Sequence, residues 1–251
     1  MAGLPASVTQ ALKDAGHEDT TASIETAYND LLENRVDFVE YGDPDKLTDK
    51  ERAKLNCVLL TQVVIHRAER LVVASGQMFE SKNLYGLALA VRGHLEAVAV
   101  LGYMARRLDS LQKENIDFAR FEEDIANGLM GAMDDLFKEA KAPVNILTAV
   151  EHADKLFDAD LFKEKRQILR ELYLWLCEFA HPNFCSKKTA FDLDKDTGRM
   201  VLRKVDALTN DHYQMLVTLS MSCDFLQWLI ALFDERVAQY FAEEPPQQAA
   251  P

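Results

Sequence analysis

The C-terminal part of the chain carries the most regular pattern of apolar residues. Between about Thr209 and Phe241, apolar residues recur at alternating steps of three and four, a spacing that keeps one seam of a helix against a partner helix. The residues of this seam are Leu216, Leu219, Cys223, Leu226, Ile230, Phe233, Val237 and Tyr240. The pattern predicts a long final helix whose seam packs within the chain, with a seam between two chains as the alternative.

Three further apolar residues, Phe225, Trp228 and Leu232, lie outside that seam and widen the apolar surface of the final helix. A helix that is apolar over more than one seam is either central to its own bundle or shared with a neighbour. We therefore expect a homodimer through the C-terminal helix, with these three residues near the contact.

Helical periodicity recurs along most of the preceding chain. The segments with this pattern are 8–15, 21–40, 48–79, 83–108, 118–141 and 144–157, followed by a helix that ends at His181. Thr48 and Glu51 have the spacing of a capping box, and Asp158 or Asp160 is expected to cap the helix that ends at His181. Pro182 cannot continue that helix.

After Pro182 the pattern changes to alternating apolar and polar residues. Residues 189–194 and 200–205 alternate on either side of a turn that contains Gly198, which predicts a β-hairpin at about 189–205. Because its two faces are not both apolar, the hairpin should lie against the helices or a partner. The expected fold is all-α, a multi-helix bundle with one β-hairpin inserted before a long C-terminal helix. Residues 1–242 should form a single domain, and 243–251 a disordered tail.

Composition and charge narrow the expected setting. The 251 residues are 48% hydrophobic, and the net charge is −13, of which −7 falls in residues 1–50. This negative charge argues against a broad nucleic-acid-binding face but does not exclude a nucleic-acid partner. The hairpin region, in contrast, is locally basic. The four cysteines are scattered, and we expect neither a signal peptide nor a membrane span. These features are typical of a reduced, cytoplasmic, soluble protein.

A charged pair interrupts the apolar helix at 83–108. Arg92 and Glu96 lie four residues apart, on one helical face with Tyr85 and Tyr103. One interpretation is an ion pair within a polar core. The other is functional: Arg92 fixes an anionic or carboxylate group, and Glu96 orients the guanidinium.

A second pair of ionisable residues, Glu178 and His181, ends the apolar helix before Pro182. Their Glu-x-x-His spacing occurs in helical bundles that bind two metal ions, but such sites need a second pair of this kind, and no other Glu here has a His three residues later. We therefore expect no metal and no cofactor. The alternative for His181 is a helix-terminal histidine that bonds to carbonyl groups.

The apolar surroundings of both pairs suggest a common site. Isolated charges are costly to bury, so we expect Arg92, Glu96, Glu178 and His181 to converge in one polar pocket, as candidate catalytic residues. The candidate ligand-binding residues are Tyr85, Tyr103, Arg170 and Asn183; Arg170 lies almost three turns before His181.

Two segments carry a resemblance to a known family. The Arg-x-x-x-Glu motif within 84–108, and the Tyr…Glu-Phe-x-His-Pro motif of 173–182 followed by a hairpin, resemble a family of uncharacterised bacterial helical proteins, a domain of unknown function. With the hairpin and the final helix, the similarity covers about half of the chain. It implies an all-helical fold with an Arg, a Glu and a His gathered in the interior.

A more distant similarity is to the HEPN proteins, helical bundles that often dimerise and include ribonucleases. Their catalytic signature is an Arg followed, after four to six residues, by a His, and no Arg of this chain has a His at that distance. The sequence therefore favours a binding or regulatory module with an internal Arg/Glu/His cluster. The alternative is a HEPN-like nuclease or toxin-type enzyme with an atypical active site.

Overall fold

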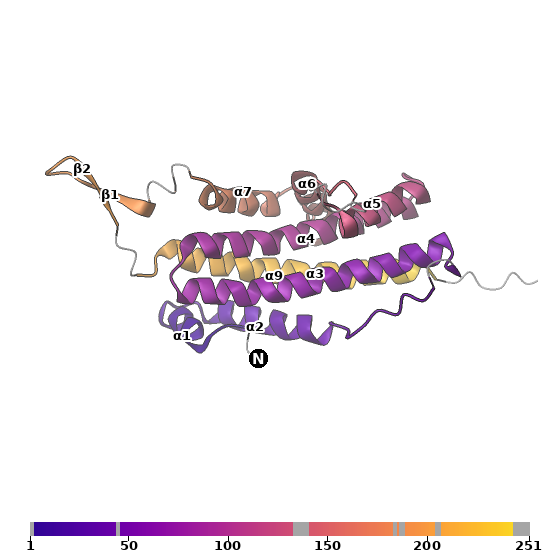
Figure 1. The fold of residues 1–251 in the computed structure, drawn as a ribbon, viewed down its shortest axis with the longest axis horizontal. Helices are drawn as coiled ribbons and strands as arrows, with labels where there is room; N and C mark the ends of the chain where they lie inside the picture. The colour runs from indigo at the N-terminus through magenta and orange to yellow at the C-terminus, as the bar shows by residue number, and fades with distance from the viewer. Residues whose placement is uncertain are drawn as a thin grey trace, which may run out of the picture.

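The computed structural model describes residues 3–43, 46–132, 141–182, 185, 189–203 and 207–242. Over these residues the protein is a helical bundle with one two-stranded hairpin before the last helix, as the sequence predicts (Figure 1). The elements are α1 (Ala6–Asp14), α2 (Glu18–Glu33), α3 (Asp49–Glu80), α4 (Leu84–Gln112), α5 (Phe118–Met130), α6 (Ile146–Leu156), η2 (Phe157–Phe162), α7 (Ile168–Ala180), β1 (Phe191–Asp194), β2 (Arg199–Leu202) and α9 (Asn210–Tyr240).

The helices form three layers, with α4 and α9 at the centre. In Figure 1, α3, α4 and α9 run side by side, α1 and α2 lie on one side of them, and α5, α6 and α7 lie on the other. Helix α4 packs against α3, α5, α6, α7 and α9, whereas α9 packs against α2, α3 and α4. A helix with so many neighbours must be apolar nearly all round, which is what the alanine- and leucine-rich sequence of α4 provides.

Local sequence signals place the ends of the two long helices α3 and α4. Thr48 caps α3 by accepting a hydrogen bond from the Glu51 backbone N–H, and the Glu51 carboxylate accepts one from the Thr48 N–H, so the predicted capping box is present. Asn83 caps α4 through the Gly86 N–H. Only Ser81, Lys82 and Asn83 separate the two helices, so α3 and α4 are antiparallel neighbours.

The predicted seam of α9 packs inside the chain. From Leu216 to Val237 its residues are buried, and Tyr240 is half-buried. Phe225, expected at a dimer contact, is also buried: its ring stacks on Phe157 of η2 at a centroid distance of 4.7 Å, and Trp228 packs on Phe157 at 5.6 Å. Much of the apolar surface that suggested a dimer through α9 is therefore covered by η2 of the same chain.

The hairpin forms where the sequence predicts it. Strands β1 and β2 pair antiparallel around a turn at 195–198, in which Gly198 takes a positive φ of 67°. The hairpin projects beyond the end of the bundle (Figure 1), and its strand residues are exposed apart from Asp194, which is half-buried. It does not lie flat against the helices.

Several helix boundaries differ from the expected ones. Helix α2 spans 18–33 instead of 21–40, and α5 ends at Met130, because Gly131 takes an extended conformation. The sequence also missed η2, a π-helix that continues α6 and ends at Lys163 in the left-handed conformation. Neither Asp158 nor Asp160 is the N-cap residue of α7, a position taken by Gln167. The predicted disordered tail, 243–251, lies outside the described residues.

Helices α4 and α9 are each long and apolar enough to cross a membrane, judged by length and composition alone. The sequence-based expectation had recognised no stretch of that length. Most of each apolar stretch is buried inside the bundle, and core helices of soluble proteins commonly have this character.

Candidate functional site

The predicted charged pair of α4 forms and has a partner on α7. The Arg92 Nε donates to the Glu96 Oε1 at 3.1 Å, and one terminal nitrogen of Arg92 donates to the Tyr173 hydroxyl at 3.1 Å. The guanidinium carbon lies 5.2 Å from the centre of the Tyr173 ring, within the range of a cation–π contact. Two helices therefore fix one guanidinium group.

A second arginine approaches the same carboxylate from α3. A terminal nitrogen of Arg67 lies 3.7 Å from the Glu96 Oε2, and its side chain is largely exposed. We use the name Arg92 cluster for Arg67, Arg92, Glu96 and Tyr173, contributed by α3, α4 and α7. With two guanidinium groups and one carboxylate, the Arg92 cluster is positive overall in a strongly acidic protein.

The electrostatic environment keeps Arg92 and Tyr173 in their usual protonation states. Burial alone would lower the pKa of Arg92, but the neighbouring Tyr173, Cys177 and Glu96 outweigh it and raise the pKa above its usual value. Burial raises the pKa of Tyr173, although Arg92 acts in the opposite direction. At neutral pH the cluster therefore presents a charged guanidinium bonded to a neutral phenol.

Exposed apolar residues occur near the Arg92 cluster along both α4 and α7. Leu89 lies three residues before Arg92 on α4 and is 54% exposed, and Leu174 follows Tyr173 on α7 and is 45% exposed. Residues three apart on a helix share a face, so Leu89 borders Arg92 directly. A fixed charge thus lies beside exposed apolar surface.

Glu178 and His181 are expected in the site because an apolar helix should bury them. Both side chains are instead exposed. Helix α7 lies on the outside of the bundle and buries only the face with Leu169, Tyr173, Leu176 and Phe179. Because α7 runs antiparallel to α4 (Figure 1) and Tyr173 meets Arg92, the eight residues from Tyr173 to His181 place His181 about 12 Å further along the helix axis. Burial therefore does not force these residues to join Arg92, and their convergence with it stays a prediction.

Three of the predicted ligand-binding residues, Tyr85, Tyr103 and Arg170, lie apart from one another. The Tyr85 hydroxyl bonds to the Thr189 hydroxyl at 2.6 Å, joining α4 to the base of the hairpin. The Tyr103 hydroxyl donates to Asp124, which also pairs with Arg107. Arg170 lies at the start of α7. Asn183 lies outside the described residues.

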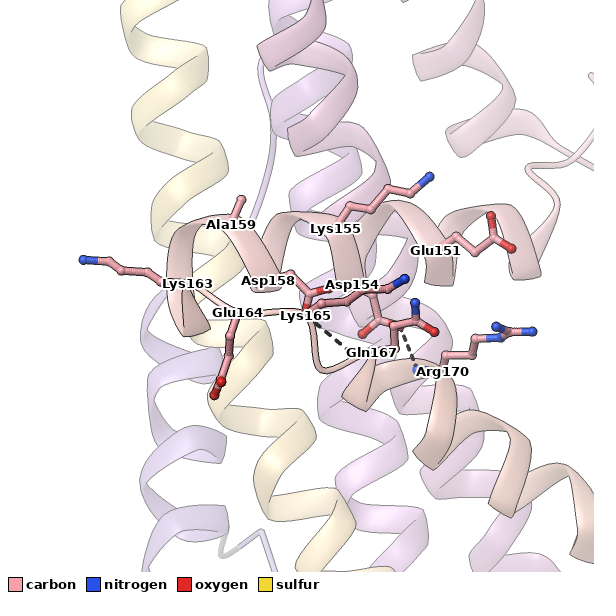
Figure 2. Close-up of a pocket in the computed structure, with 10 residues that line it drawn as sticks. All are labelled: Glu151, Asp154, Lys155, Asp158, Ala159, Lys163, Glu164, Lys165, Gln167 and Arg170. Carbon is pink, nitrogen blue, oxygen red and sulfur yellow. Dashed lines mark hydrogen bonds between the residues drawn. The ribbon is translucent and has the colours of Figure 1, made fainter.

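Arg170 lines a cavity of about 550 Å³ between α6, η2 and the start of α7 (Figure 2). Asp154, buried in its wall, accepts hydrogen bonds from the Leu169 and Arg170 N–H groups, and Asp158 accepts from those of Arg166 and Gln167. Asp154 thus satisfies two N-terminal donors of α7, and Asp158 satisfies those of the two residues before the helix. Burial raises the pKa of Asp154 to about 6. The cavity wall therefore has a clear structural role.

Buried polar groups elsewhere belong to the core. His94 lies within hydrogen-bond distance of the Ser222 hydroxyl, at 2.7 Å, and burial lowers the pKa of its imidazole to about 4. It is neutral at pH 7 and joins α4 to α9, on the opposite side of α4 from Arg92, as its spacing indicates.

Sequence reasoning missed Tyr173 and Arg67 as members of the cluster. Tyr173 stands at the start of the motif at 173–182, but no local spacing relates it to Arg92, 81 residues earlier. Arg67 has the pattern of an ordinary surface residue of α3.

Among the described residues, no group of three His, Cys, Asp or Glu side chains is arranged to hold a metal ion. Comparison of the chain with protein-family models, curated proteins and solved structures gave no match.

Proposed function

We propose that this protein is a binding or regulatory module that recognises an anionic group, a carboxylate or a phosphate, at Arg92. The observation that carries the proposal is the hydrogen bonding of the three nitrogens of the Arg92 guanidinium. Nε is bonded to Glu96 and one terminal nitrogen to Tyr173, while the other terminal nitrogen has no hydrogen-bond partner among the described residues. The side chain is 24% exposed, so part of it is open to a ligand.

A guanidinium held in this way suits anion recognition. Its planar donors match carboxylate and phosphate oxygens, and a side chain already fixed by the protein loses little entropy on binding. Arg67 supplies a second cation within reach of Glu96, and its mostly exposed side chain can turn toward a bound anion. The positive excess of the cluster favours an anionic ligand over a cationic one.

The neighbouring apolar residues extend this ligand class. Leu89 and Leu174 expose apolar surface on the two helices that fix Arg92. Covering this surface would add hydrophobic stabilisation to the charge contact. The ligand that fits combines an anionic head with an apolar portion.

The cluster supports binding more directly than catalysis. Proton transfer requires a group whose pKa lies near the working pH. The pKa values of Arg92 and Tyr173 are both raised, which moves these groups further from neutrality.

Isothermal titration calorimetry with four probes tests this proposal: acetate, inorganic phosphate, octanoate and octanol. We expect octanoate to bind more tightly than acetate or octanol, because it alone combines both features. Arg92→Gln should weaken octanoate binding about tenfold or more, the loss expected for one charge-assisted contact. Arg70→Gln, a matched change at an exposed arginine of α3, should have no effect.

Two outcomes would overturn the proposal. One is wild-type protein that binds none of the anions; the other is equal binding by Arg92→Gln and wild type, with circular dichroism showing both folded. The nuclease alternative, based on the HEPN resemblance, has its own assay: cleavage of single-stranded RNA that is lost in His181→Ala would favour an enzyme over a binding module.

A further inference from the structure

Helix α7 begins without a cap from its own sequence. Its N-cap residue, Gln167, takes a left-handed conformation with a φ of 53°, and its side chain forms no capping hydrogen bond. The backbone N–H groups of Leu169 and Arg170, the second and third residues of the helix, are those that a capping side chain ordinarily satisfies. Here they donate to the two carboxylate oxygens of Asp154 on α6, at 2.9 and 3.0 Å. The start of α7 is therefore fixed by a residue of another helix.

Asp154 is itself held in place by the close packing of α6 on α4. It is 3% exposed, and it follows Ala153, which is fully buried. A Cβ atom added to Gly102 of α4 would lie 3.1 Å from the Cα of Ala153, so the backbones of the two helices nearly touch at this point. Packing as tight as this leaves neighbouring groups little freedom to shift. The Asp154 carboxylate therefore keeps a set position relative to α4.

The same helix α4 carries the anion-binding arginine. Arg92 lies ten residues before Gly102, or about 15 Å along the helix axis. On α7, Tyr173 follows Leu169 by four residues, about one turn, and its hydroxyl accepts the hydrogen bond from Arg92. Helix α7 thus contacts α6 at Asp154 and α4 at Tyr173, one turn apart. A shift or rotation of its first turn would move Tyr173 relative to Arg92.

We propose that Asp154 is a positioning residue for the anion site at Arg92: by capping α7, it holds Tyr173 where the phenol fixes the Arg92 guanidinium. The inference rests on the proposed function and adds to it a residue that does not touch the ligand. A guanidinium that turns freely must lose rotational freedom when an anion binds, whereas one already held by Tyr173 loses less. The affinity for an anion should therefore depend on the cap.

Asp158 offers a matched comparison. It lines the same cavity as Asp154 and lies four residues further along the chain (Figure 2). Its carboxylate accepts hydrogen bonds from the N–H groups of Arg166 and Gln167, which precede α7, and not from the first turn of the helix. Removal of the Asp158 carboxylate should therefore leave Tyr173 in place.

Carbon-detected NMR of the ligand-free protein tests the positioning directly, through the rotation of the Arg92 guanidinium about its Nε–Cζ bond. Rotation should be slow in wild type and in Asp158→Ala, and about tenfold or more faster in Asp154→Ala, the change expected when one charge-assisted hydrogen bond is lost. Asp154→Asn, whose amide oxygen still accepts from one N–H group, should lie between. If circular dichroism shows Asp154→Ala to be unfolded, Asp154→Ser takes its place, because one hydroxyl cannot serve both N–H groups.

A double-mutant cycle on octanoate affinity shows whether Asp154 acts through Tyr173. Asp154→Ala should weaken binding about threefold to tenfold, the equivalent of one helix cap. In a Tyr173→Phe background, where the hydroxyl is already lost, the same change should cost less than about twofold. Equal losses in both backgrounds, or unchanged rotation of the guanidinium in Asp154→Ala, would overturn the inference. Wild-type protein that binds no anion would overturn the proposed function instead, and the rotation rates would still decide the role of Asp154.

Discussion

Arg92 illustrates how a charged residue is accommodated in a helix surrounded by other helices. Its side chain lies on α4, bonded to Tyr173 of α7, and is 24% exposed. Glu96 neutralises it from the same helix, and Tyr173 accepts a hydrogen bond from across the interface. Every member of the arrangement gains a partner, so a polar group at this position need not destabilise the bundle.

Replacing Arg92 by Ala should lower the free energy of unfolding by about 1–2 kcal/mol, because the hydrogen bond to Tyr173 and the pair with Glu96 are lost at a half-buried site. Urea denaturation followed by circular dichroism measures the change. Lys113→Ala is the control: it breaks a pair with Asp109 of the same spacing whose lysine is largely exposed, and should cost less than about 0.5 kcal/mol. Equal costs would mean that Arg92 is effectively solvated.

Asp154 makes the stability of the protein depend on pH. Burial raises its pKa to about 6 in the folded state, above the usual value of 3.8, despite two backbone hydrogen bonds that act in the opposite direction. The folded protein therefore holds this proton to higher pH than the unfolded chain does, so the contribution of Asp154 to stability falls as pH rises from 4 to 6.5.

Across that window, wild-type protein should lose about 2–3 kcal/mol of stability relative to Asp154→Asn, which cannot titrate. Urea denaturation of both proteins at half-unit steps of pH gives the difference directly and cancels the other carboxyl groups. A difference that does not change with pH would show that Asp154 titrates alike in the folded and unfolded states.

At the scale of elements, glycines in α4 show how closely its neighbours approach. A Cβ atom built on Gly102 would lie 2.7 Å from the Cβ and 3.1 Å from the Cα of Ala153 in α6. The same atom on Gly93 would lie 3.3 Å from a terminal carbon of Leu71, a flexible side chain. Helix α6 can therefore pack on α4 only because residue 102 has no side chain.

Gly102→Ala should destabilise the fold by about 1–2 kcal/mol, because the overlap with the α6 backbone outweighs the gain in helix propensity. Gly93→Ala in the same helix gains that propensity with little overlap, and should be neutral or stabilising by up to about 1 kcal/mol. Chemical denaturation of the pair measures the contrast. Destabilisation of the two variants by the same amount would contradict the close contact between α4 and α6.

At the scale of the whole molecule, α4 and α9 form one core that all three layers share. Helices from both halves of the chain pack on them: α2 against α9, and α6 and α7 against α4. Loss of α9 would expose apolar surface on α2, and loss of α4 would expose it on α6 and α7. The bundle should therefore unfold as one cooperative unit, as expected for a single domain.

The two tryptophans allow this cooperativity to be tested. Trp175 reports on α7, and Trp228 on the contact between α9 and η2. Urea transitions of Trp175→Phe and Trp228→Phe, followed by fluorescence and by far-UV circular dichroism, should have the same midpoint for both probes within each variant. A fluorescence transition that precedes the loss of helix would indicate that one layer unfolds separately.

The sequence by itself determined the helices, the hairpin and the pair within α4. Apolar spacing, the capping box of Thr48 and the turn at Gly198 act over a few residues, so local chemistry is enough to place them. The Arg92–Glu96 pair follows from the same helical geometry, because residues four apart are neighbours on any helix. Most helix boundaries were correct to within a few residues for the same reason.

Only the tertiary structure decided which polar groups meet. Tyr173 reaches Arg92, and Asp154 caps α7 from α6, through helix packing that no local spacing encodes. Burial could not be inferred for Glu178 and His181, since an apolar helix at the edge of a bundle keeps one solvated face. The exposure of the hairpin likewise depends on where the chain directs the two strands after α7, and on the absence of a described helix beneath them.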